Sequence, residues 1–359
     1  MALYVSSKLK HYRWLCKVIS PAYLQGKSNL SIPVGDKDWR EIIYLASFHG
    51  VLPSLFIALR NNQLLDSLPK DLSEALEGFY ELNCLFNVQL RDQIISTTRL
   101  LNGCGIEPIW LKGAIHLLAP NWRQSSRTMA DLDLWIPEPK EQLLAIEILT
   151  NDGYFIQPES VGKDYRLSQH YAPIIKSGQP ARLEIHRHIV TPFCCALLND
   201  EDALKKVVRG DKEGCSFGIL STEDQIMQSY LQCTEQGADC FNPRNTVGLM
   251  KMVDFLERFS SPDHLEKWFS ENPQLNGEPW RLKARQFHSH LNCYFSIDYN
   301  GKKNSSYMRQ VVFALNFPRL DGIYYIIKHG SFLLWRRKLG ALNNWPGKLY
   351  RKLVFLKSL

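Results

Sequence analysis

The sequence lacks any run of about 20 uncharged apolar residues, the length needed to cross a bilayer. The closest approach, residues 322–335, is interrupted by Lys328 and His329. The first 20 residues carry scattered basic side chains and no continuous apolar stretch, so we expect neither a signal peptide nor a spanning helix. The nine cysteines are odd in number and include no C-x-x-C pair, which argues against a disulfide framework or a zinc site. We therefore expect a cytoplasmic protein.

Several common enzyme motifs are also missing. The chain has no G-x-x-x-x-G-K-[ST] loop, no G-x-G-x-x-G and no H-E-x-x-H. Their absence excludes P-loop, dinucleotide-binding and zincin sites of the standard kind. The H-R-D and D-F-G patterns of protein kinases are absent too, which disfavours transfer of a γ-phosphoryl group.

The composition is that of a folded protein whose basic residues are concentrated at one end. Hydrophobic residues make up 45% of the 359 positions, which predicts well-filled cores. Nine of the 43 Lys and Arg residues lie in residues 319–359, together with one of the 36 acidic residues, so the rest of the chain is near neutral. This tail also contains aromatic residues, a mixture that suits an anionic membrane surface or a nucleic acid. A basic surface helix that closes the last domain is equally consistent with the pattern.

The hydrophobic periodicity divides the chain into four parts and predicts an α+β fold. Apolar residues recur at helical spacing through 38–62 and 90–105, whereas short strand-like runs bounded by proline or glycine follow in the next hundred residues. Helical spacing returns after Ser221, which opens a pattern close to a capping box. The predicted divisions are a helical N-terminal region (1–104), an α/β core with a small mixed sheet (105–220), a helical C-terminal region (221–318) and the basic aromatic tail (319–359).

Two aspartates stand in one of the predicted strands. The segment 131–136 reads DLDLWI and has the length and flanking proline of a strand. Side chains two apart in a strand share a face, so Asp131 and Asp133 point together while Leu132 and Leu134 pack into the opposite layer. Two carboxylates on one face form a cradle for Mg²⁺, which prefers oxygen ligands. A D-x-D pair alone is a common pattern, so neighbouring residues decide its meaning.

Two neighbouring motifs support a metal and nucleotide site. Gly113 lies where a predicted strand turns into a helix, a place where backbone N–H groups can receive a triphosphate. In the predicted strand 181–189, Glu184 and His186 share a face, so Glu184 would supply a third acid. Two aspartates and a third carboxylate are a ligand set for two-metal nucleotidyl transfer.

The chain resembles the uncharacterised nucleotidyltransferase family of the DNA polymerase β-like superfamily. The residues that carry the resemblance are Leu111-Lys112-Gly113, Arg127, Asp131-Leu132-Asp133-Leu134, His170 and Glu184-Ile185-His186. The similarity extends from HGVLPSLF in the N-terminal part to LSTEDQIM in the third part. In two respects the chain departs from the superfamily: Ala114 replaces the usual serine, and the gap from Gly113 to Asp131 is longer than in minimal members.

The resemblance implies a nucleoside triphosphate as donor, with ATP as the default, and Mg²⁺ or Mn²⁺ as cofactor. It implies that Asp131, Asp133 and Glu184 are catalytic residues and metal ligands, and that Gly113 contacts phosphates. The predicted activity is transfer of a nucleoside monophosphate to a hydroxyl acceptor with release of pyrophosphate. The acceptor is a small molecule, a protein or an RNA. The alternative is an inactive protein of the same fold that binds RNA or a membrane surface through its tail, which would place it at the membrane periphery.

Several polar residues have both a functional and a structural interpretation. Lys112 and Arg127 are predicted to bind nucleotide phosphates; a solvated strand end and neutralisation of the carboxylates are the structural alternatives. His170 and His186 are expected to line the site, and His186 is equally interpreted as a hydrogen-bonded structural residue. Asp254 lies within an apolar helical pattern, where a salt-bridged core acid is the usual meaning and a substrate contact the other.

Overall fold

The computed structural model describes residues 2–20, 35–120, 126–166, 168–234 and 248–277, together with Ala284, Phe287, His288 and Leu291. The predicted tail 319–359 and most of 278–318 lie outside the described residues. The predicted division into four parts therefore stays a prediction. In the part that is described, no helix combines the length and the apolar character needed to span a membrane.

A seven-stranded mixed sheet lies at the centre of the α/β part, and its strand order is β3-β4-β5-β2-β1-β7-β6. Strands β2 and β5 are parallel, as are β1 and β7, and the remaining pairs are antiparallel. The strands are β1 (Ile109–Trp110), β2 (Asp131–Trp135), β3 (Phe155–Ile156), β4 (Ile174–Ile175), β5 (Arg182–His186), β6 (Val208–Lys212) and β7 (Cys215–Ile219).

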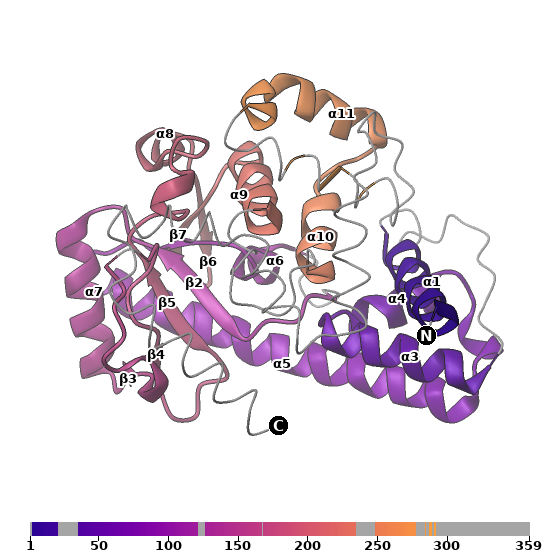
Figure 1. Ribbon diagram of the computed structural model, residues 1–359. Helices are drawn as coiled ribbons and strands as arrows, with labels where there is room; N and C mark the ends of the chain where they lie inside the picture. The colour runs from indigo at the N-terminus through magenta and orange to yellow at the C-terminus, as the bar shows by residue number, and fades with distance from the viewer. Residues whose placement is uncertain are drawn as a thin grey trace.

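Helices surround this sheet, and the α+β prediction is confirmed. Figure 1 shows α5 running from the N-terminal helices to the sheet, with α9, α10 and α11 on the opposite side of the molecule. The helices are α1 (Ala2–Val18), α3 (Asp36–Phe48), α4 (Leu52–Asn61), α5 (Lys70–Asn102), α6 (Ala114–Leu118), α7 (Pro139–Asn151), α8 (Asp200–Lys205), α9 (Thr222–Thr234), α10 (Leu249–Leu256) and α11 (Pro262–Glu271).

The two faces of the central strands β2 and β5 have opposite chemistry. Leu132, Leu134, Leu183 and Ile185 are buried in an apolar cluster that also contains residues of α5 and α7. Because side chains alternate along a strand, the residues between them face the other side, and these are mainly charged. The alternation predicted from DLDLWI is therefore confirmed, and burial of the apolar face fixes the register that places the acids on the other face.

A second apolar cluster connects the two helical regions. It contains buried residues of α1, α3 and α4 together with residues of α9, α10 and α11, and also Trp135 at the end of β2. The helix α9 begins as predicted, because the Ser221 hydroxyl accepts a hydrogen bond from the Asp224 N–H at 3.2 Å. This cluster packs the helical regions next to the charged face of the sheet.

The buried amide of Gln93 links α5 to the start of β5 through hydrogen bonds. Its Nε2 donates to the Ala181 carbonyl at 2.8 Å and to the Tyr154 hydroxyl at 3.2 Å, and its Oε1 accepts from the Ala181 N–H at 3.1 Å. Gln93 is 1% exposed. One side chain therefore satisfies both backbone groups of Ala181, a residue adjacent to the strand that carries Glu184.

We expect Gln93→Ala to lower the free energy of unfolding by about 2–4 kcal/mol, because it leaves two buried backbone groups of Ala181 without partners. Urea unfolding followed by circular dichroism measures the change. The control is Gln89→Ala, an exposed glutamine on the same helix, which should change stability by less than about 0.5 kcal/mol. Equal effects of the two variants would contradict this role for Gln93.

Candidate active site

The parallel pairing of β2 with β5 brings the predicted acids together. In the register of these strands Asp133 is opposite Glu184, Asp131 is opposite Arg182, and Trp135 is opposite His186. Residues directly opposite each other in a sheet have neighbouring side chains on the same face. Two acids that are 51 positions apart in the sequence thus become neighbours, as the sequence analysis predicted.

Asp133 is the most enclosed of these acids and has two partners on one oxygen. Lys112 Nζ lies 2.5 Å from Asp133 Oδ1, and His186 Nε2 lies 2.7 Å from the same atom. Only 4% of Asp133 is exposed. Burial would raise the pKa of its carboxyl, but the Lys112 ammonium and the His186 ring outweigh it and hold the pKa well below its usual range. Asp133 is therefore ionised at neutral pH.

Glu184 has a different environment. Burial, and then the neighbouring charge of Asp133, raise the pKa of Glu184 to about 7 in spite of Lys112 and Arg182. Arg182 Nε lies 3.2 Å from Glu184 Oε1, and His170 Nε2 lies 3.5 Å from Glu184 Oε2. Near pH 7 Glu184 is therefore partly protonated whereas Asp133 is ionised, an arrangement that is frequent where a carboxylate exchanges a proton.

Asp131 lies at the more exposed edge of the group. Its Oδ2 accepts a hydrogen bond of 2.9 Å from Arg182, which also contacts Glu184. The side chains of Asp131 and Arg182 are 38% and 36% exposed. Arg182 therefore joins two of the three predicted acids from the strand that carries one of them.

A backbone turn after β1 directs Lys112 to the acids. The Leu111 N–H donates to the Asp133 carbonyl at 3.0 Å and extends the pairing of β1 with β2 by one residue. Lys112 then adopts a left-handed conformation with φ of +52°, which is uncommon for residues other than glycine. Burial lowers its pKa, but Asp133 and Glu184 outweigh this and leave the pKa raised. Lys112 is therefore a mostly enclosed cation with a side chain 17% exposed, not the solvated strand end that was the alternative.

Gly113 packs closely against Met129 and Arg127, which precede β2. A Cβ atom at this position would be 2.6 Å from Met129 Sδ and 3.4 Å from Arg127 Nε. Its φ of −59° is open to any residue, and a larger residue here would have to displace the Met129 side chain. Helix α6 has five residues, and the N–H groups of Ala114 and Ile115 donate to the carbonyls of Leu111 and Lys112. The helix dipole therefore adds little, and phosphate binding by Gly113 stays a prediction.

Arg127 connects the sheet to the C-terminal helices. Its Nε lies 3.1 Å from Asp254 Oδ2 on α10, and His116 Nε2 lies 3.9 Å from Asp254 Oδ1. Asp254 is thus a salt-bridged buried acid, as one of its two interpretations stated. The same segment reaches the N-terminal helices, because the Thr128 hydroxyl donates to the Gly50 carbonyl at 2.9 Å. The segment before β2 therefore contacts three parts of the chain.

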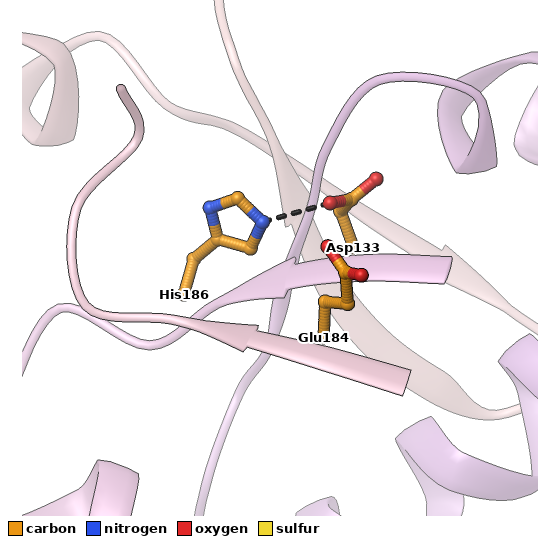
Figure 2. A group of neighbouring side chains, drawn as sticks. All are labelled: Asp133, Glu184 and His186. Carbon is orange, nitrogen blue, oxygen red and sulfur yellow. Dashed lines mark hydrogen bonds and ion pairs between the residues drawn. The ribbon is translucent and has the colours of Figure 1, made fainter. Parts of the chain in front are cut away.

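Three residues of this face are arranged so that they could hold a divalent metal ion. Each of Asp133, Glu184 and His186 offers one ligand atom, and these atoms lie within 4.8 Å of one another. Figure 2 shows the three side chains projecting from β2 and β5 toward a common point, with the contact between His186 and Asp133 marked. Carboxylate oxygens and imidazole nitrogen are all ligands of divalent metals, so the residues present fit such an ion.

Most of the predicted site residues lie close together in the structure, and one basic residue that was not predicted joins them. His170 and His186 are neighbours with ring centroids 5.5 Å apart, and burial lowers the pKa of His170 to about 4. Asp131 lies outside the group of three potential metal ligands. Lys251 on α10 was not predicted; burial, and then the charges of Lys112 and Arg127, lower its pKa. The position of Lys251 in the sequence, one helical turn before Asp254, could have indicated that it lies on the same helix face.

The fold and the site define the class of the protein. The mixed sheet presents acids from neighbouring strands next to partly buried basic groups, as the resemblance implies. Residues 35–275 match the model of a family described as uncharacterised nucleotidyltransferase, which covers more than half of the chain. The protein belongs to this family, as the resemblance predicted. No curated protein and no solved structure matches the chain.

The raised pKa of Glu184 predicts that the metal-free protein loses stability as the pH rises. In the unfolded chain the pKa returns to its ordinary value near 4.5, so the contribution is complete below 4.5 and is lost as the pH passes 7. We expect Glu184→Gln, which imitates the protonated form, to be more stable than wild type in EDTA at pH 8 and equally stable at pH 5. Urea unfolding at both pH values tests this.

The exposed Glu147 provides the control, since Glu147→Gln should change stability equally at both pH values. A lower stability of Glu184→Gln at pH 8 would show that the Glu184 carboxylate is held in its charged form, contrary to this account.

Proposed function

We propose that the protein transfers a nucleoside monophosphate from a nucleoside triphosphate, ATP by default, to a hydroxyl group of an acceptor. The acceptor oxygen attacks the α-phosphorus in line, and the bond from that phosphorus to the oxygen bridging to the β-phosphate breaks. Pyrophosphate leaves, and the acceptor proton passes to the carboxylate of Glu184. The acceptor is a small molecule, a protein side chain or an RNA end.

The observation that carries this proposal is the buried group of Asp133, Glu184 and His186 within a chain of the nucleotidyltransferase family. Asp131, Asp133 and Glu184 are proposed to hold Mg²⁺ or Mn²⁺. Bound there, a divalent cation neutralises the phosphate oxygens and stabilises the attacking and leaving oxygens. The residues themselves contribute positioning, because β2 and β5 are fixed by the apolar face beneath them.

Basic groups on the same side support binding of the triphosphate. Lys112, Arg127 and Lys251 are brought together from the turn after β1, the segment before β2 and helix α10. Partly buried cations interact with phosphate more strongly than cations in water do, because less solvent screens them. We assign the β- and γ-phosphates to this side of the site.

The neutral histidines suit proton transfer away from the acceptor. Burial lowers the pKa of His170 to about 4, so this ring is uncharged at pH 7 and does not repel the donor's metal ion. Its Nε2 lies 3.5 Å from Glu184 Oε2. We propose that His170 orients the Glu184 carboxyl while that group accepts the proton.

The test is incubation of the purified protein with Mg²⁺ or Mn²⁺, each α-labelled nucleoside triphosphate and cell extract. We expect label to pass to an acceptor, and Asp133→Ala and Glu184→Ala to reduce transfer by about 100-fold or more, since each removes a charge from the reacting centre. Asp211→Ala, an exposed acid on β6, is the control. Equal transfer by all variants, or none by the folded wild type, would contradict the proposal.

Lys112 gives a second prediction with two opposite effects. Its ammonium lies 2.5 Å from Asp133 and therefore competes with a metal cation for that carboxylate. We expect Lys112→Met to bind Mn²⁺ about tenfold more tightly without nucleotide, since about 1.4 kcal/mol of repulsion is removed. The same variant should bind the nucleoside triphosphate more weakly. Isothermal titration with each ligand measures both changes.

The control is Lys140→Met, an exposed lysine of α7, which should alter neither affinity. Circular dichroism establishes that Lys112→Met is folded, and Lys112→Arg, which keeps the charge, should retain nucleotide binding. Weaker binding of both ligands by a folded Lys112→Met would contradict the proposed competition.

A further inference from the structure

The ring of His186 faces a hydrogen-bond acceptor at each nitrogen. Nδ1 lies 3.1 Å from the His188 carbonyl oxygen, and Nε2 lies 2.7 Å from Asp133 Oδ1. A carbonyl and an ionised carboxylate only accept, so each contact needs a proton on the ring nitrogen. A neutral imidazole carries one N–H. One of the two nitrogens of a neutral His186 therefore presents a lone pair.

The carboxylate of Asp133 does not depend on His186 for a proton. Lys112 donates to the same Oδ1 at 2.5 Å and supplies a full positive charge. The His188 carbonyl, in contrast, has the Nδ1–H group as its partner from this ring. A metal-bound histidine typically donates its second ring N–H to a backbone carbonyl or a carboxylate, which fixes the tautomer and the ring orientation. His186 has this arrangement on its Nδ1 side.

The position of His186 in the sheet directs Nε2 to the acids. His186 ends β5 two residues after Glu184, so both side chains lie on the charged face. The ring is 0% exposed, and a backbone bridge between His170 and His186 holds this end of the strand. Its ligand nitrogen and the oxygens of Asp133 and Glu184 lie within 4.8 Å of one another (Figure 2). No large rearrangement is needed for all three to reach one ion.

We propose that His186 is a direct metal ligand through Nε2, so that the primary metal centre is formed by Asp133, Glu184 and His186 and prefers Mn²⁺ to Mg²⁺. This inference rests on the proposed metal-dependent function and specifies its cofactor. Mg²⁺ is bound almost entirely by oxygen, whereas imidazole suits the softer first-row transition metals. Asp131, which is paired with Arg182 outside the group, then serves the metal that accompanies the nucleotide.

The experiment is pulsed electron paramagnetic resonance of the full chain with one equivalent of Mn²⁺ and no nucleotide. We expect a ¹⁴N coupling from a directly bound imidazole, which changes to the ¹⁵N pattern when the histidines are labelled with ¹⁵N. The coupling should disappear in His186→Gln and remain in His188→Gln and His170→Gln. Titrations should show a loss of Mn²⁺ affinity of about tenfold or more in His186→Gln, with a smaller change for Mg²⁺.

The outcomes separate this inference from the proposed function. Mn²⁺ bound without nitrogen coupling, or a coupling lost only in His170→Gln, would overturn the assignment of His186 and leave a metal-dependent enzyme. Absence of any Mn²⁺ or Mg²⁺ binding to the folded wild type would contradict the metal site as a whole. The change from the ¹⁴N to the ¹⁵N pattern is measured on the wild-type protein. Direct binding of a histidine nitrogen is therefore tested even if His186→Gln does not fold.

Discussion

Neutralisation of Asp133 by Lys112 is the interaction on which the rest of the site depends. A buried carboxylate without a partner is strongly unfavourable, and here three acids share one face of a sheet. Lys112 reaches Asp133 because the pairing of β1 with β2 continues through Leu111 and the chain then turns in a left-handed conformation. Arg182 similarly joins Asp131 to Glu184. Lys112, which stabilises the metal-free site, is also one of the residues that we propose to bind the phosphates of a nucleotide.

A second buried ion pair and a hydrogen bond connect the site to the helical regions. Arg127 pairs with Asp254 on α10, and its segment also bonds to the loop before α4 through Thr128 and Gly50. Buried ion pairs add little net stability but are costly to break, so they fix the position of one element against another. These two contacts therefore join the segment before β2 to both helical regions.

Local patterns in the sequence predicted the positions of the acidic residues on the two central strands. The alternation in DLDLWI placed Asp131 and Asp133 on one face, and the spacing of Glu184 and His186 did the same for β5. Partners that depend on long-range pairing were not predictable, such as Lys112 for Asp133 or Arg182 for Asp131. The hairpin of β6 and β7 was also not predicted, although Glu213 and Gly214, both with positive φ, form its two-residue turn.

The metal site is best tested by diffraction at the Mn absorption edge, on crystals grown with Mn²⁺ and a non-hydrolysable nucleoside triphosphate. We expect an anomalous peak at about 2.0–2.3 Å from carboxylate oxygens of both Asp133 and Glu184, with the triphosphate on the side of Lys112 and Arg127. Nucleotide bound with no peak between these two acids would contradict it, as would a metal ion held only at other residues.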